Sequence, residues 1–288
     1  TRHGAWMKRL SAPGLDEALD EPHKAQARDP QARASVPPAG SAGVAAAAAV
    51  GRMKAWADGQ RFGRDERGEE QLVDGKGTQV MMAWERPYMV RCIDALRITE
   101  ADSVLEVGFG CGYSADRIQA ARPRQHTIIE CAEPVLVRLR AWAAERPGVV
   151  VVEGTWQATL PDLGTYDAIF FDDFGAPGLS EHEMMAGCAS EEYRAEYAAA
   201  PSHFHAFLQI ALRWHAAPEG RLSGYLQMQT ALDLRRDDAE VVLRRMPVAP
   251  PPHCHYFQDR VAIVPLITKK ARGGAGAPAE QQTEQSDP

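Results

Sequence analysis

The feature that most constrains the fold is a regular alternation of short apolar runs with longer segments of helical periodicity. The strands expected from it are residues 103–107, 126–131, 149–152, 166–171 and 222–226, and the main helices are residues 113–121, 135–145 and 203–215. Strands that alternate with helices predict an α/β fold with a doubly wound, mostly parallel sheet. Such sheets bind ligands outside the carboxyl ends of their strands, so the functional residues are expected there.

One folded domain is expected, over residues 51–270. Residues 1–50 and 271–288 are rich in Ala, Pro, Gly and charged side chains. Segments of this composition bury too little apolar surface to offset the entropy lost when they become ordered. Both ends are therefore predicted to be disordered.

Charge and composition exclude several classes of partner. The formal net charge of −7 argues against a nucleic-acid partner, because nucleic-acid-binding domains usually carry a basic face. No apolar run reaches the roughly 18 residues that a membrane span needs. We expect a monomer or a weak homodimer.

The cysteines are scattered and form no C-x-x-C pair, which argues against a disulfide framework or a structural zinc site. A reducing compartment fits this pattern, with the cytoplasm as the default. The five cysteines are Cys92, Cys111, Cys131, Cys188 and Cys254.

A glycine-rich turn follows the first expected strand, in the sequence Leu105-Glu106-Val107-Gly108-Phe109-Gly110-Cys111-Gly112. Glycines at a strand-to-helix turn let the backbone approach a ligand closely and present amide groups at the start of a helix. The spacing differs from G-x-G-x-x-G, so the dinucleotide fingerprint is not met. Glycine-rich turns also occur for packing reasons, so a second signal is needed.

Two acidic residues at strand ends supply further signals. Glu130 ends the second strand, about 20 residues after the glycines, where a carboxylate is placed to accept hydrogen bonds from both ribose hydroxyls. Asp172 ends the fourth strand and faces the same crevice, although aspartates also end strands because they favour turns. Together the turn and Glu130 predict a ligand that contains a nucleoside.

At this point the chain resembles the guanidinoacetate N-methyltransferase family, over about residues 56–270. A related family, the fungal- and plant-type protein arginine N-methyltransferases, shares the V-M-M-x-W-E and F-F-D segments. The segments that carry the resemblance are Val80-Met81-Met82-Ala83-Trp84-Glu85-Arg86-Pro87-Tyr88-Met89, Leu105-Glu106-Val107-Gly108-Phe109-Gly110, Ile128-Ile129-Glu130-Cys131, Glu153-Gly154-Thr155-Trp156, Ile169-Phe170-Phe171-Asp172 and the closing Cys254-His255-Tyr256.

The resemblance implies a seven-stranded, Rossmann-like sheet of the class I methyltransferase type, with S-adenosylmethionine as the methyl donor. Trp156 would lie beside the adenine, and Trp56 matches the family's N-terminal lid tryptophan. Met81 and Met89 would line the cofactor pocket, although a spacing of eight residues also suits ordinary helix packing. The implied cofactor site comprises Trp56, Met81, Met89, Gly108, Phe109, Gly110, Cys111, Gly112, Tyr113, Glu130, Cys131, Ala132, Thr155, Trp156 and Asp172.

By the same resemblance, Glu85 and Asp172 are the catalytic pair that grips the guanidinium group of the acceptor. A guanidinium has a pKa of about 12.5 or more, so at neutral pH it has no free lone pair with which to attack a methyl group. Two carboxylates offset its charge, orient its planar fork and can accept the departing proton. The alternative for Glu85 is a glutamate at a helix start that stabilises the helix dipole.

The chain departs from the family in two places. After the fifth strand, Met228 and Gln229 replace a Thr-Ser pair that helps to hold the acceptor's carboxylate, so they are candidate substrate-binding residues. An insertion at about 175–201 follows the fourth strand, next to the predicted active site. Loops in such positions tend to set the choice of substrate.

Histidines at H-x-H spacing raise the alternative of a metal site. They occur at His203 and His205 and at His253 and His255, and His182 precedes Glu183 in the insertion. Two residues of a strand spaced in this way lie on one face. No cysteine or carboxylate set completes a familiar ligand pattern, so no metal is predicted.

The sequence therefore predicts a small-molecule N-methyltransferase that acts on a guanidino compound, with guanidinoacetate, giving creatine, as the first expectation. Methylation of arginine, free or in a protein, is the nearest alternative, and another small amine is a further one. A non-catalytic cofactor-binding protein that kept the fold is also weighed, but both carboxylates of the predicted pair are present.

Overall fold

The structure is a computed structural model, and it describes residues 39–173, 175–226, 234 and 236–271. Its first element, helix α1 (Ala39–Asp58), begins within the segment that the sequence predicts to be disordered. Helix α1 therefore crosses the boundary predicted at residue 50. The alanine run at 45–49 has high helix propensity, which the composition argument overlooked.

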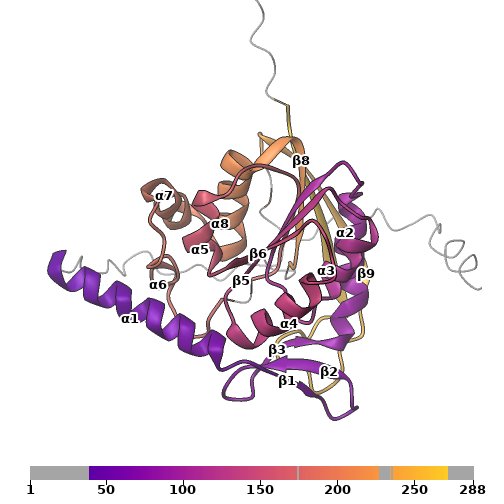
Figure 1. The fold of residues 1–288 in the computed structure, drawn as a ribbon, viewed down its shortest axis with the longest axis horizontal. Coiled ribbons are helices and arrows are strands. Elements are labelled where there is room, and N and C mark those ends of the chain that lie inside the picture. Colours follow the sequence, from indigo (N-terminus) through magenta and orange to yellow (C-terminus); the bar gives the residue numbers. More distant parts are fainter. Residues whose placement is uncertain (1–38, 174, 227–233, 235, 272–288) are drawn as a thin grey trace, which may run out of the picture.

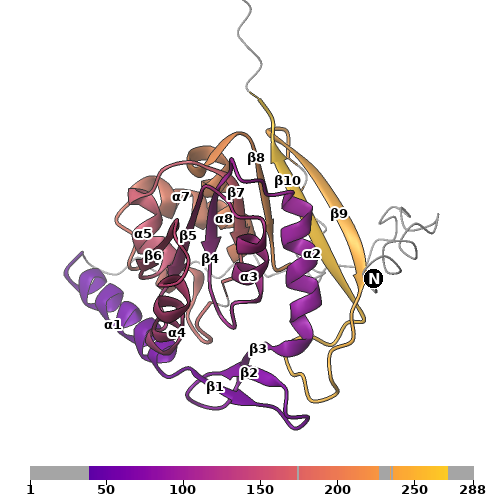
Figure 2. The ribbon, with the colours of Figure 1, turned by 45° about the vertical axis from the view of Figure 1, so that its right-hand side comes forward.

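The core of the molecule is a seven-stranded sheet, shown in Figures 1 and 2. Its order is β6-β5-β4-β7-β8-β10-β9, and the strands are parallel from β6 to β8. Strand β10 is antiparallel to both β8 and β9. This confirms the predicted doubly wound, mostly parallel, seven-stranded sheet. The strands are β4 (Ser103–Val107), β5 (Gln125–Glu130), β6 (Val149–Glu153), β7 (Tyr166–Phe171), β8 (Ala216–Gly224), β9 (Ala239–Pro247) and β10 (Val261–Lys269).

Helices cover both faces of the sheet, because the side chains of a buried strand alternate between its two sides. In β4, Val104 packs with one group of helices and Leu105 with the other. On the first side lie α2 (Arg86–Leu96), α3 (Tyr113–Ala120) and α4 (Glu133–Ala143). On the second side lie α5 (Trp156–Thr159), α7 (Glu191–Ala199) and α8 (His203–Ile210), which continues as a π-helical turn (Ala211–His215).

A small antiparallel sheet precedes the main one and was not predicted. It consists of β1 (Arg61–Arg64), β2 (Glu70–Val73) and β3 (Gln79–Met82), and a short 3-10 helix, Ala83–Glu85, follows directly. Its strands are too short and too mixed in polarity to give a clear period-2 pattern. The small sheet matters because it delivers Met81 and Glu85 to the carboxyl ends of the central strands.

The insertion contains helices α6 (Glu181–Met184) and α7, both begun by serine caps. All five cysteines are free. Among the described residues, no helix combines the length and apolar character needed to cross a membrane.

Candidate active site

The glycine-rich turn follows β4 with three glycines in the left-handed region. Gly108, Gly110 and Gly112 have φ values of 87°, 49° and 81°. A Cβ atom on Gly108 would lie 2.1 Å from the carbonyl oxygen of Asp172, and one on Gly110 would lie 2.7 Å from Met81 Sδ. The turn therefore needs glycine both for its backbone conformation and for space.

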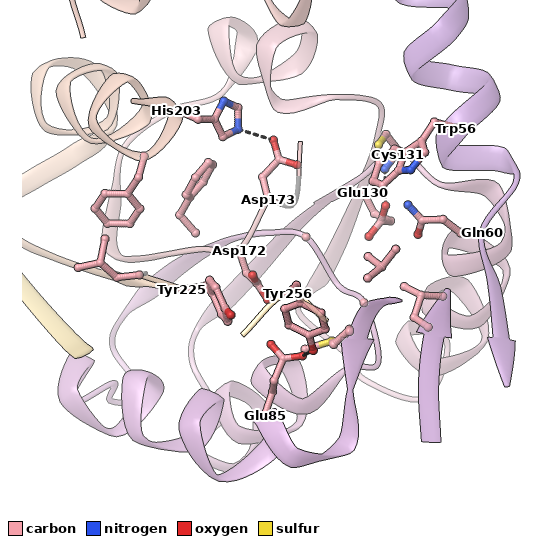
Figure 3. A pocket seen from close by; sticks show the side chains of 18 of the residues that line it. Trp56, Gln60, Glu85, Glu130, Cys131, Asp172, Asp173, His203, Tyr225 and Tyr256 are labelled. Atoms are coloured by element: carbon pink, nitrogen blue, oxygen red, sulfur yellow. Dashed lines mark hydrogen bonds and ion pairs between the residues drawn. The ribbon is translucent and has the colours of Figure 1, made fainter. Parts of the chain in front are cut away.

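Glu130 closes β5 and holds the turn through backbone amides. Its Oε2 accepts a hydrogen bond of 3.0 Å from Phe109 N. Its Oε1 accepts bonds of 2.7 Å from Cys131 N and 2.9 Å from Ala132 N. Burial raises the pKa of Glu130, and these amides act against that rise. The predicted ribose-binding carboxylate thus lies at the cavity wall in a fixed position (Figure 3).

A second cavity adjoins the first beside Glu130, which lines both, as do Trp56, Gly108, Cys131 and Asp173. Thr155 and Trp156 line the second cavity, as the resemblance implies for the adenine end. The indole Nε1 of Trp156 donates a 2.8 Å hydrogen bond to Asp173 Oδ2, which also lies 2.8 Å from His203 Nε2.

Glu85 lies on the other side of the first cavity. Glu85 is only 3% exposed. Its Oε1 accepts a 2.9 Å hydrogen bond from Met82 N and a second hydrogen bond from the Tyr256 hydroxyl. Burial raises the pKa of Glu85 to about 7, and the two hydrogen bonds act in the opposite direction. Among the described residues, no Lys or Arg pairs with this carboxylate.

Asp172 follows β7 and lines the same cavity. Burial raises the pKa of Asp172 well above its usual value, and the negative charge of Glu85 raises it further. Within the part of the chain that the structure describes, its carboxylate accepts no hydrogen bond. The two carboxylates predicted to act together therefore share one cavity, and each feels the charge of the other.

Tyr225 stands directly after β8, where its ring meets Tyr88 edge to face at 5.6 Å. Its hydroxyl is buried and has no hydrogen-bond partner among the described residues. The charges of Glu85 and Asp172 reinforce the burial that raises the pKa of Tyr225. The phenol thus offers an unused donor and acceptor beside the carboxylate pair, as Figure 3 shows.

The structure places several predicted cofactor residues behind the cavity rather than in it. Met89 is fully buried in the core of the α2 side, because the chain changes from strand to helix between Met81 and Met89. Tyr113 bonds Glu70 Oε2 at 3.0 Å. The predicted residues that line neither cavity are Met89, Phe109, Cys111, Gly112, Tyr113 and Ala132. Met228 and Gln229 lie outside the described residues.

Several cavity residues were missed by the sequence analysis. Tyr256 could have been found, because it stands in the Cys254-His255-Tyr256 segment that carries the resemblance. Val80 and Phe171 also stand in segments that carry the resemblance. The others give no local signal, because they come from just after the end of α1, from β2, from the turns after β7 and β8 and from the start of α8. The missed residues of the first cavity are Gln60, Leu72, Val80, Phe171, Asp173, Ser202, His203, Phe204, Tyr225, Leu226 and Tyr256.

Two of the histidines considered as metal ligands have other partners. His203 bonds Asp173 and Tyr197, and His253 Nε2 lies 2.9 Å from Asp65 Oδ2. Within the described ranges, no three His, Cys, Asp or Glu side chains are grouped so that they could hold a metal ion.

The strand order, the glycine-rich turn and the carboxylate that closes β5 define the class of the protein: the chain has the fold of the class I S-adenosylmethionine-dependent methyltransferases. Residues 52–187 match the family model described as guanidinoacetate N-methyltransferase, which confirms the resemblance found from the motifs. The predicted cofactor, S-adenosylmethionine, is confirmed at the level of this class.

Curated relatives carry a different name. The chain is 39% identical over 111 residues to "Protein arginine N-methyltransferase 2" of Aspergillus oryzae, across 36% of this chain and 27% of the relative. It is 36% identical over 109 residues to the protein of the same name from Saccharomyces cerevisiae, across 36% of this chain and 26% of the relative. The matched part thus spans about a quarter of these relatives.

Solved structures show only distant likeness. The putative methyltransferase yhhF from Escherichia coli is 15% identical with a TM-score of 0.45, over 74% of this chain and 100% of that one. The tRNA m1G37 methyltransferase of M. jannaschii is 12% identical with a TM-score of 0.46, over 75% of this chain and 58% of that one.

Proposed function

We propose that this protein transfers a methyl group from S-adenosylmethionine to a nitrogen of a guanidinium group, with arginine, free or in a peptide, as the first candidate acceptor. The observation that carries the proposal is the pair of carboxylates, Glu85 and Asp172, in one cavity beside the glycine-rich turn. Among the described residues that line this cavity, none is Lys or Arg. An acidic cavity of this kind favours a cation.

The residues present fit the proposed cofactor. Gly108 and Gly110 line the first cavity and have no side chain, so their backbone forms part of its wall. Glu130 lines both cavities and can accept hydrogen bonds from a ribose diol. The indole of Trp156 supplies an apolar surface for a flat base. The carboxylates of the first cavity also offset the positive charge of a sulfonium.

When bound, S-adenosylmethionine would supply a methyl group on a positively charged sulfonium, and the acceptor nitrogen that received this group would have to give up one proton. Glu85 and Asp172 hold the planar acceptor by charge-assisted hydrogen bonds. Either carboxylate can take the proton, because burial raises the pKa of both. The Tyr256 hydroxyl fixes the orientation of Glu85.

Arginine is placed first for two reasons. The curated relatives are named protein arginine N-methyltransferases. Guanidinoacetate carries a carboxylate, which arginine within a peptide lacks, and the described lining of the first cavity contains no Lys or Arg that could pair with it. Guanidinoacetate remains the second candidate because the matched family model bears that name.

The test is a methyl-transfer assay with S-adenosylmethionine, in which product mass is compared for an arginine-containing peptide, free arginine and guanidinoacetate. Asp172→Asn is expected to lower kcat/KM at least about 100-fold, because it removes one of the two charges that hold the cation. Asp259→Asn, an exposed control that makes the same chemical change, is expected to leave kcat/KM unchanged.

Turnover of guanidinoacetate in preference to both arginine acceptors would reverse their order. Cofactor binding without turnover of any guanidino compound would overturn the proposed acceptor class and redirect the search to other amines.

A further inference from the structure

The insertion at 175–201 lines the second cavity rather than the first. Gly175, Ala176 and Met184 contribute to the wall of the second cavity. None of the described residues of the insertion lines the first cavity, which holds the carboxylate pair. This differs from the sequence-based expectation that the insertion sets the choice of acceptor.

Helix α1 also contributes to the wall of the second cavity. Met53 and Trp56 of this helix line it. Helix α6 of the insertion packs against α1, and Arg52 of α1 forms an ion pair with Glu183 of α6. Two segments far apart in sequence thus lie side by side (Figure 1), and both line the second cavity.

Local contacts fix the position of Met184. Ser180 caps α6 by accepting a hydrogen bond from Glu183 N, and Glu183 Oε2 accepts a 2.9 Å bond from Ser180 N. This reciprocal capping box sets the start of the helix. Gly175 leaves room for the thioether, because a Cβ atom there would lie 2.9 Å from Met184 Sδ.

The far end of the insertion supports the same cavity from behind. The Tyr197 hydroxyl lies 2.6 Å from His203 Nδ1, and His203 reaches Asp173, which accepts the Trp156 indole N–H. The rings of Trp156 and Tyr197 lie 6.3 Å apart. The indole that lines the cavity is therefore held by a chain of contacts that ends in α7.

The chemistry of the two cavities orients the ligand. Glu130 lines both, so a ligand whose diol bonds to this carboxylate extends into each. The second cavity is rich in aromatic and thioether side chains, which suit a flat base. The first cavity holds the acidic pair and suits a cationic centre.

We propose that the insertion is a wall of the nucleoside end of the cofactor site, in which Met184, held by the α1–α6 contact, packs on the base. The inference rests on the proposed function. It makes the insertion a determinant of cofactor affinity, and it leaves the choice of acceptor to the first cavity.

The test measures the Kd of S-adenosylhomocysteine for the full chain by calorimetry. Met184→Ala is expected to weaken binding about ten-fold, because it removes apolar contact with the base. At saturating cofactor the KM of the acceptor should not change. Met185→Ala is the matched control: Met185 is the buried neighbour that lines neither cavity, so the change should lower stability and leave the Kd within about two-fold.

A second variant and its control, both at surface residues, test the proposal if the methionine variants fold poorly. Arg52→Gln breaks the ion pair with Glu183 and leaves the capping box intact, so a measurable increase in Kd is expected. Lys54→Gln is the matched control, because it removes a positive charge from the same helix. Among the salt bridges of the described residues Lys54 pairs with Asp58 and not with α6, so this variant should leave the Kd unchanged.

If the wild type binds S-adenosylhomocysteine and the Kd is unchanged in both Met184→Ala and Arg52→Gln, this inference is overturned and the proposed function is not. A rise in acceptor KM without a change in cofactor Kd would assign the insertion to the acceptor instead. Failure of the wild type to bind would overturn the proposed function, and this inference would fall with it.

Discussion

At the scale of single residues, Glu85 is the side chain whose environment departs most from what its sequence position suggests. A glutamate before a helix is usually exposed and stabilises the helix dipole. Here it is 3% exposed, bonded to Tyr256, and without a cation in the described chain. Because a buried carboxylate without a cation is costly, the free protein holds this residue at the expense of stability.

The first prediction follows from the pKa of Glu85, which burial raises from 4.5 to about 7. The folded state then holds the proton more tightly than the unfolded state, so folding stability falls as pH rises between these values. Glu85→Gln removes this penalty. We compare the free energy of unfolding of Glu85→Gln with that of the wild type at two pH values. The advantage of the variant should be about 1–3 kcal/mol larger at pH about 8 than at pH about 4.5.

Urea titrations at the two pH values measure this difference, and an equal effect of the substitution at both would contradict it. In the same variant kcat/KM for the acceptor should collapse. In the wild type, kcat/KM should rise as pH increases through about 7, because the cation is held by the ionised form.

At the scale of elements, the turn between β4 and α3 is the part that packing restricts most. Gly108→Ala would place a methyl group 2.1 Å from the Asp172 carbonyl oxygen, at a φ of 87°. Both the contact and the dihedral are unfavourable, so we expect a loss of at least about 2 kcal/mol of stability and weaker binding of S-adenosylhomocysteine.

Gly51→Ala makes the same chemical change in α1, where no atom lies within 4 Å of the new Cβ. It is expected to be neutral or to stabilise the protein by up to about 1 kcal/mol. Denaturant midpoints of the two variants measure the contrast. Equal stability of Gly108→Ala and the wild type would mean that the turn does not approach Asp172 as described.

At the scale of the whole molecule, a net charge of −7 and an acidic cavity act in the same direction. A cationic peptide should therefore be attracted from a distance, and salt should screen this attraction. Between about 20 and about 300 mM salt, kcat/KM for an arginine peptide with net positive charge should fall at least about three-fold.

Guanidinoacetate carries one positive and one negative charge, so its kcat/KM should change little over the same range. Steady-state kinetics on both acceptors measure the difference. An identical salt dependence for the two would exclude steering by the charge of the protein.

The sequence by itself determined the positions of the five parallel strands and of α3, α4 and α8, the glycine-rich turn and the position of Glu130. These features follow from local periodicity and from the rule that parallel strands present their carboxyl ends at one edge. Asp172 was found from its position at the end of the fourth strand, Glu85 was named through the resemblance, and the structure brings both to one cavity.

Only the tertiary structure decided what surrounds these residues. Met81 reaches the cavity and Met89 does not, because a strand and then a helix carry them in different directions. Tyr225 and Tyr256 join the site from strands and loops whose pairing is not local. Likewise the insertion follows Asp172 in sequence, but its helix α6 packs on α1, where Arg52 of α1 forms an ion pair with Glu183, because the chain between them folds back across the ends of the strands.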